Sequence, residues 1–247
     1  MAYKCEKCGL ESNKKDNFLK LKSLHYSYKV LYCLQCAEEI ITKREKSKLI
    51  ASTIILFGGL IWSIITNREN EYAWLFFQGG LFLCFTTLLV LPHELGHVIA
   101  AVMVRAKVFE VSIGIGKTLF KRKFLGIEWN FHIIPTCGYT NLGICSRRLH
   151  RTRRFLAVSG GPIAHCLLIY VAIVLSYGVS SPWAIAIGNM FILANLYVFF
   201  GSILPRKTYL SGKKSPSDGL LLLTEPFMSN SKIDEQIEWS KIASNNI

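Results

Sequence analysis

Residues 73–104 read AWLFFQGGLFLCFTTLLVLPHELGHVIAAVMV, and this stretch decides the fold of the 247-residue chain. It is longer than the roughly 20 apolar residues that a helix needs to cross a hydrocarbon core of about 30 Å. Glu94 is its only formally charged side chain. Because an ionisable group at membrane depth is costly, it usually marks a functional site. We therefore expect a membrane helix built around a functional Glu94.

The pentad His93-Glu-Leu-Gly-His97 gives that function a chemistry. Residues four apart lie on one face of a helix, so both histidines can bind one zinc ion, with Glu94 beside them as general base. A catalytic zinc usually has three protein ligands and one open position. Four side chains outside the pentad could supply the third ligand: Asp218, Glu225, His132 and His165. Asp218 also precedes the apolar run Leu220–Leu223, where an Asp is often only a helix N-cap.

Three more apolar segments accompany the first, at residues 49–66, 155–179 and 183–204. We therefore expect about four transmembrane helices. Residues 105–154 contain eleven Lys and Arg against two acidic residues, and basic loops face the cytoplasm. This distribution predicts a cell-membrane protein with both termini cytoplasmic. It also accounts for much of the formal charge of +13, so nucleic acid is disfavoured as a partner.

Within the basic loop, two segments have strand composition: Val108–Gly116 and Ile127–Ile134, with Gly126 in the turn region. A hairpin at the membrane face could offer its edge to an extended peptide. A plain cytosolic hairpin is the alternative. The two interpretations remain equally open from the residues alone.

The N-terminal region contains two cysteine pairs, Cys5-x-x-Cys8 and Cys33-x-x-Cys36, around a β-branched and aromatic stretch. Two such pairs across a hairpin are typical of a structural zinc ribbon. A module this small needs its metal to fold. Its expected role is structural, or recognition of a partner. The division that follows is a zinc-ribbon-like domain, a charged linker, a membrane domain and a cytosolic tail, at residues 1–42, 43–48, 49–223 and 224–247.

The order of motifs resembles the site-2 protease family of intramembrane zinc metalloproteases. The resemblance covers most of residues 73–223. Beyond the pentad it rests on four segments: Phe109–Gly116, Ile134-Pro-Thr-Cys-Gly-Tyr139, Ser159-Gly-Gly-Pro162-Ile-Ala-His165, and Asn195 followed by Leu204-Pro205 and Asp218-Gly219. Family members often have Asn at the position of His165.

The resemblance implies a membrane zinc endopeptidase in which His93, His97 and Asp218 bind the catalytic zinc. Glu94 would be the general base. Side chains or backbone at three positions would contact the substrate or the oxyanion: His165, Asn195 and Gly138. Substrates would be transmembrane proteins or signal-peptide remnants in the lipid bilayer. One catalytic and one structural zinc are then expected.

Two other functions remain open. One is a catalytically silent membrane scaffold that keeps the zinc pentad and binds partners. The other is a regulatory protein whose active part is the ribbon, with nucleic acid as a possible ligand. Under all three, the expected fold is an α-helical multi-pass membrane protein with a membrane-associated β-hairpin and a small zinc ribbon.

Overall fold

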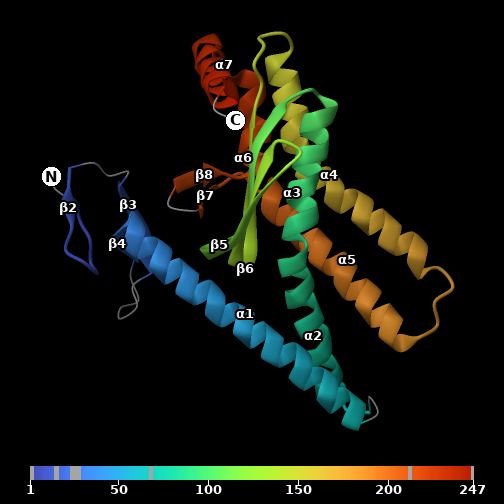
Figure 1. Cartoon of the computed structure of the whole chain (residues 1–247). Helices are drawn as coiled ribbons and strands as arrows, with labels where there is room; N and C mark the ends of the chain where they lie inside the picture. The colour runs from blue at the N-terminus through green and yellow to red at the C-terminus, as the bar shows by residue number, and fades with distance from the viewer. Residues whose placement is uncertain (1–2, 14–16, 23–28, 67–68, 211–212, 246–247) are drawn as a thin grey trace.

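The computed structural model describes residues 3–13, 17–22, 29–66, 69–210 and 213–245. Long helices dominate it, with one long β-hairpin beside them and a small strand-rich region at the N-terminus (Figure 1). This arrangement confirms the predicted helical multi-pass fold.

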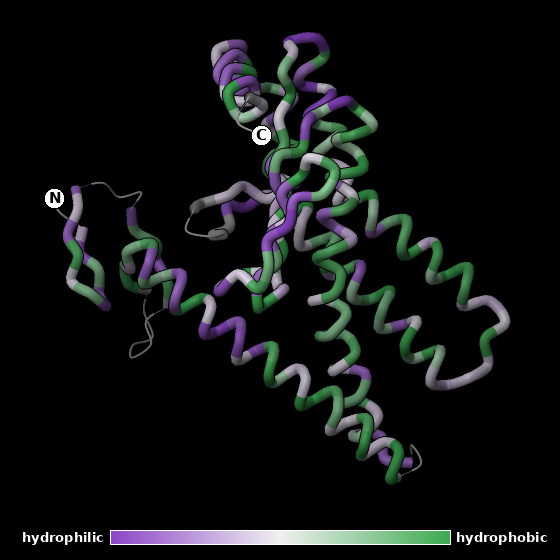
Figure 2. Tube along the Cα trace, viewed as in Figure 1, coloured by the Kyte–Doolittle hydropathy of each residue, from purple (hydrophilic) through white to green (hydrophobic). Residues whose placement is uncertain are grey.

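Four helical segments are long and apolar enough to cross a membrane. They are α1 (Leu34–Ile65), α2 (Glu71–Leu88) continuing into α3 (Val90–Met103), α4 (His150–Ser176) and α5 (Pro182–Ile203). Their large apolar side chains are widely exposed; Ile54, for example, is 65% exposed. The hydrophobic turns in Figure 2 follow these helices. Such surface is unfavourable in water and suits lipid, so the chain is a membrane protein.

The second span is divided into α2 and α3 at Leu89, three residues before Pro92. Proline has no backbone N–H, and its ring clashes with the carbonyl four residues earlier, here that of Leu88. The sequence required residues 73–104 to tilt, kink or project from the membrane, because a straight helix of that length exceeds the hydrocarbon thickness. The helix is interrupted at Leu89, so the H-E-L-G-H pentad lies on α3 and not on α2.

Helices α3 and α4 are in backbone contact where two glycines meet. A Cβ atom on Gly96 would overlap the carbonyl oxygen of Gly160, and one on Gly160 would overlap that of Gly96. Small residues allow this approach between membrane helices. The contact brings the pentad against the Ser159-Gly-Gly-Pro162 segment of α4.

The predicted hairpin is present and longer than expected, with β5 (Lys107–Phe124) antiparallel to β6 (Ile127–Gly143). It also curls: Glu110–Ile113 have partners in residues 138–141 and second partners in residues 128–131. Buried side chains of the hairpin and its flanking residues, of α3 and of α4 form one core. Its members are Val90, Val98, Ala101, Ala106, Val108, Val111, Ile113, Ile127, Ile144 and Ala157. Figure 1 shows the hairpin beside α3.

The N-terminal region has two short antiparallel pairs, β1 (Tyr3–Lys4) with β2 (Glu11–Ser12), and β3 (Phe18–Lys22) with β4 (Lys29–Cys33). The second pair confirms the predicted hairpin; residues 23–28 lie outside the described part. Helix α1 begins directly after β4 and continues through residues 43–48. The predicted linker is therefore helical, and the division into domains stays a prediction.

After α5 the chain forms the hairpin β7 (Lys207–Leu210) and β8 (Lys213–Pro216). Helix α6 (Asp218–Thr224), the 3-10 turn η2 (Glu225–Phe227) and helix α7 (Asn230–Asn245) follow. Helix α7 packs on the open end of the long hairpin, near the start of β5, where the rings of Trp239 and Phe109 meet edge to face at 5.3 Å.

Candidate metal centre

Three predicted ligands from two distant parts of the chain meet in one cluster. His93 Nε2 lies 3.0 Å from Asp218 Oδ2, and His97 Nε2 lies 3.5 Å from the same oxygen. The two Nε2 atoms are 3.3 Å apart. Two imidazole nitrogens and one carboxylate oxygen are a donor set that zinc accepts in catalytic sites.

The space around these atoms also suits a metal ion. A Cβ atom on Gly161 of α4 would lie 2.5 Å from His97 Nε2 and 2.6 Å from His93 Cε1. Any larger residue would therefore occupy the space next to the converging nitrogens. His97 Nδ1 lies 3.1 Å from the carbonyl oxygen of Ala157, a partner that orients the ring. The residues present fit a zinc ion.

Asp218 is available as a ligand because another residue caps its helix. Ser217 is the N-cap of α6, and its hydroxyl oxygen accepts from the Leu220 amide at 3.3 Å. The alternative that Asp218 is only a cap is therefore wrong.

The hairpin β7–β8 accounts for the long spacing between Pro205 and Asp218. Lys207 pairs with Pro216 at its open end, and the Ser217 amide donates to the Arg206 carbonyl at 2.8 Å. The chain therefore returns to the end of α5 before α6 begins. At the junction, a Cβ atom on Gly219 would overlap the Ile203 carbonyl oxygen, so α6 starts in backbone contact with α5.

Glu94 is 3% exposed and faces the β6 strand. Its Oε2 accepts from the Thr140 hydroxyl at 2.7 Å. A Cβ atom on Gly138 would lie 2.7 Å from Glu94 Oε1, so only glycine leaves this approach open. The predicted general base thus has one oxygen held by Thr140 and the other beside the backbone of Gly138.

His165 and Asn195, the two substrate or oxyanion candidates, are both fully buried. His165 Nε2 lies 3.1 Å from His93 Nδ1, and His165 Nδ1 lies 2.9 Å from Asn195 Oδ1. Both ring nitrogens therefore already have partners within the protein. The role in substrate contact stays a prediction for these residues and for Gly138.

Of the other possible third ligands, His165 contacts His93 at Nδ1, and Glu225 and His132 have partners away from the histidine pair. Glu225 is 1% exposed, and its Oε1 accepts from Arg154 Nε of α4 at 2.6 Å. His132 belongs to the long hairpin, with Nε2 3.1 Å from the Ser112 hydroxyl and Nδ1 3.0 Å from the Gly116 carbonyl. Of these four side chains, Asp218 is the one whose oxygen contacts the Nε2 atoms of both histidines.

A second cluster joins the four N-terminal cysteines, whose sulfur atoms all lie within 4.8 Å of one another. The Cys8 and Cys33 sulfurs are 3.6 Å apart, and the Cys33 amide donates to the Cys5 sulfur at 3.2 Å. Burial opposes ionisation of Cys5, yet hydrogen bonds from the amides of Cys33, Cys8 and Lys7 lower its pKa to about 6. The four sulfurs are arranged as in a ribbon-type zinc site, with Cys36 contributing from the first turns of α1, and zinc binding by them stays a prediction.

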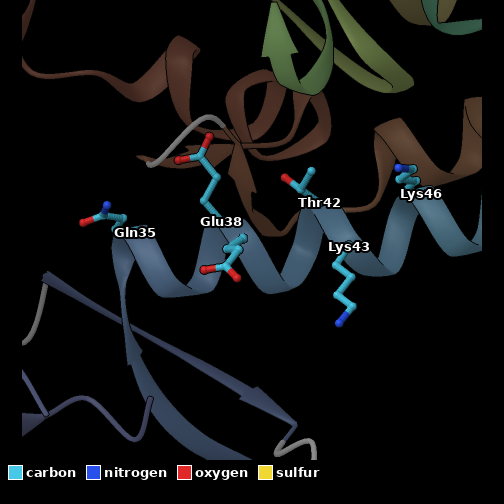
Figure 3. A pocket seen from close by; sticks show the side chains of 6 residues that line it. Gln35, Glu38, Thr42, Lys43 and Lys46 are labelled. Atoms are coloured by element: carbon cyan, nitrogen blue, oxygen red, sulfur yellow. The ribbon is translucent and has the colours of Figure 1, made fainter. Parts of the chain in front are cut away.

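An open pocket also lies along the first turns of α1 (Figure 3). Its lining residues carry both signs of charge: Gln35, Glu38, Glu39, Thr42, Lys43 and Lys46. None of them belongs to the histidine–aspartate cluster or to the cysteines. This pocket therefore carries no argument about catalysis.

Sequence reasoning missed three residues that shape the metal centre. Ser217 could have been recognised, because serine is a favoured N-cap before an apolar helix. Gly161 lies in the Ser159-Gly-Gly-Pro162 segment, and glycines in membrane helices more often indicate close helix packing than a metal site. Thr140 gave no local signal, because its contact with Glu94 depends on how the hairpin lies against α3.

Fold and site together define a membrane protein in which two histidines and a carboxylate that could hold a metal ion meet beside an interrupted apolar helix. Comparison with known families places it further: the model for Peptidase family M50 matches residues 80–242, well over half of the chain. The chain belongs to that family. The site-2 protease resemblance is thereby confirmed.

Curated relatives agree with this assignment. A Chlamydia pneumoniae protein named "Putative zinc metalloprotease" is 32% identical over 115 residues, which are 36% of this chain and 18% of the relative. A Neisseria meningitidis protein of the same description is 32% identical over 111 residues, 40% of this chain and 24% of the relative. The chain thus spans under a quarter of the length of either relative.

Proposed function

We propose that this protein is an intramembrane zinc endopeptidase that hydrolyses peptide bonds in or near transmembrane segments. The observation that carries the proposal is the convergence of His93, His97 and Asp218 beside a buried Glu94, on helices apolar enough to lie in a membrane. Membership of Peptidase family M50 and the names of the relatives support a metalloprotease.

His93 and His97 would each hold zinc through Nε2, and Asp218 through Oδ2. When bound, the ion would supply Lewis acidity, polarising the scissile carbonyl and acidifying the attacking water. Three protein ligands are the usual number in catalytic zinc sites. Ala157 fixes the ring of His97 through its carbonyl, and Gly161 keeps the space clear.

Glu94 would act as the general base and then as the general acid. It would take a proton from the attacking water and pass it to the leaving amine nitrogen. Thr140 holds one carboxylate oxygen at 2.7 Å, which limits rotation of the carboxylate while the proton is transferred. Since both groups come from elements packed on one core, their geometry is set before substrate arrives.

The β6 strand offers the substrate a place to lie extended. Residues 138–142 pair with β5 on one side only within the described part of the chain, and this segment also contacts Glu94 through Gly138 and Thr140. A helical substrate hides its peptide bonds in hydrogen bonds, so it must unwind before attack. Strand addition at this edge would replace those bonds. The expected substrates are transmembrane proteins or signal-peptide remnants.

The proposed topology follows from charge. The basic residues near Lys43–Lys48, in the 105–154 segment and around Lys207 would lie in the cytoplasm. Both termini would then be cytoplasmic. The cysteine cluster would sit in a reducing compartment, where a structural zinc is expected in place of disulfides.

Cleavage of a model single-span substrate tests the peptidase in detergent or in liposomes. Glu94→Gln is expected to abolish cleavage, with a rate at least 10²-fold lower, because it removes the general base while keeping the shape. Glu128→Gln, a half-buried carboxylate on the β5–β6 hairpin that lies outside the histidine–aspartate cluster, is the control and should cleave normally. Equal cleavage by Glu94→Gln and wild-type protein would overturn the peptidase. Metal binding without any cleavage in either would favour a silent scaffold.

A further inference from the structure

We propose that His165 and Asn195 are positioning residues that fix the ring tautomer of His93, so that its Nε2 lone pair faces the metal. The inference rests on the metal centre proposed above and adds a role for two buried side chains behind it. It is carried by a hydrogen-bond chain that crosses from α3 through α4 to α5.

The chain of hydrogen bonds has a direction because its last member can only accept. Asn195 Nδ2 lies 2.9 Å from the Phe191 carbonyl oxygen. A carbonyl has no proton to give, so the amide group of Asn195 must turn its NH₂ toward it. Asn195 Oδ1 therefore points the other way, where it lies 2.9 Å from His165 Nδ1.

The direction passes on through His165. Because Asn195 Oδ1 can only accept, His165 Nδ1 must carry the proton. A neutral imidazole has one donor and one acceptor, so His165 Nε2 is left as an acceptor, 3.1 Å from His93 Nδ1. His93 then carries its proton on Nδ1, and its Nε2 offers a lone pair to the metal.

This tautomer leaves two acceptor atoms facing each other at the metal centre. His93 Nε2 lies 3.0 Å from Asp218 Oδ2, yet in this tautomer neither atom has a proton to donate. Two lone pairs at that distance repel each other unless a cation lies between them. With the Nδ1 proton of His93 directed to His165, the Nε2 lone pair and Asp218 Oδ2 are both free to bind one cation.

The two histidines are oriented by different means. His97 Nδ1 has the main-chain carbonyl of Ala157 at 3.1 Å, whereas His93 depends on two side chains. A histidine is suited to the middle position, since it accepts on one side and donates on the other. Both His165 and Asn195 are 0% exposed, so water cannot replace either of them.

The test measures metal affinity in the full-length protein in detergent, with Co²⁺ as the probe and Zn²⁺ as competitor. The cysteine cluster gives thiolate-to-cobalt charge-transfer bands, and the histidine–aspartate site gives only weak visible bands, so both sites are followed in one molecule. His165→Leu and Asn195→Leu should each weaken the histidine–aspartate site by about 10–100-fold, the usual cost of losing an outer partner of a metal ligand. The cysteine cluster should be unchanged.

Three further variants separate the relay from a packing effect. Ser202→Ala, on the same helix α5, removes a hydroxyl bonded to the Phe199 carbonyl and should change nothing. His165→Gln can again accept from His93 and should recover much of the affinity. The double variant His165→Leu/Asn195→Leu should be no weaker than His165→Leu alone, because Asn195 acts only through His165.

Wild-type metal affinity in His165→Leu would overturn the relay. The relay would also be overturned if Asn195→Leu weakened metal binding as much in the His165→Leu background as in the wild-type protein. If His165→Leu also loses the cysteine-cluster bands, it is misfolded, and Asn195→Ala decides in its place: wild-type affinity of the histidine–aspartate site in Asn195→Ala would overturn the relay. The assay needs no substrate. If the variants show the relay but the wild-type protein cleaves no substrate, only the proposed peptidase activity is contradicted. If the wild-type protein cleaves substrate but the variants bind metal as it does, only the relay is contradicted.

Discussion

Gly161 shows how much of the metal centre depends on a missing side chain. Gly161→Ala would place a methyl group 2.5 Å from His97 Nε2 and displace one of the two rings. We expect this variant to lose the metal of the membrane site, measured as zinc content of the purified protein. Gly58→Ala is the matched control, because a Cβ atom there meets nothing within 4 Å. Full zinc content in Gly161→Ala would contradict the assigned geometry.

Thr140 is predicted to support the general base without touching the metal. Thr140→Val keeps the shape but removes the hydrogen bond to Glu94. Such a bond to a charged group is worth about 1.5–3 kcal/mol, so kcat should fall by about 10–100-fold while zinc content stays the same. Thr53→Val, which loses only a bond to its own helix, should keep the wild-type rate. Loss of zinc in Thr140→Val would mean that the residue is structural.

At the scale of elements, the position of Asp218 depends on how η2 is attached to α4. Arg154→Met would leave the Glu225 carboxylate buried without its ion-pair partner. Removing one member of a buried pair typically costs about 3–5 kcal/mol, so thermal unfolding should shift down clearly. Arg147→Met breaks an exposed pair with Asp234 and should cost about 1 kcal/mol or less. Equal shifts in the thermal unfolding temperature of the two variants would contradict a stabilising role for the buried Arg154–Glu225 pair.

The helices were predictable because their signals are local. Apolar length predicted the spans, and a kink at Pro92 was one of three expected outcomes, with tilt and projection; the structure has a helix interruption three residues earlier, at Leu89. The continuation of α1 back to Leu34 was not expected, since residues 43–48 were interpreted only as a charge run. The curl of the β5–β6 hairpin was also unpredictable, because it depends on pairing between residues far apart in sequence.

The residues of the metal centre also fall into two groups: those predictable from local sequence and those that depend on tertiary contacts. Helical spacing alone indicated that His93 and His97 share a face. Asp218 was selected through the family resemblance, because its approach depends on how β7–β8 and α6 fold after α5. The contacts of Glu94 with Thr140 and of Glu225 with Arg154 join residues far apart in sequence, so the neighbouring residues do not predict them.

For the whole molecule, the orientation in the membrane can be tested with thiol reagents. Cys145 is exposed in the segment predicted to face the cytoplasm. Ser180 is exposed in the turn between α4 and α5, on the predicted outer side. In intact cells, a membrane-impermeant maleimide should label Ser180→Cys in a Cys145→Ser background. It should reach Cys145 of the wild-type protein only after permeabilisation. The reverse pattern would contradict the topology.

The molecule as a whole is expected to hold two zinc ions, because two separate clusters have the donor atoms for one each. The cysteine cluster is continuous with the first span, since Cys36 lies in α1. Chelation that removes the ribbon zinc should therefore unfold the strands before α1, seen as faster proteolysis of the N-terminal region. The histidine–aspartate site should keep its metal if the chelator is mild.

The zinc content of the full-length protein, beside a His93→Ala/Asp218→Ala variant, tests the central claim most directly. Our account predicts two zinc ions per chain in the wild-type protein and one in the variant, with the ribbon intact in both. One zinc in both proteins would contradict it, because the metal would then belong to the cysteine cluster alone and the membrane helices would hold no catalytic centre.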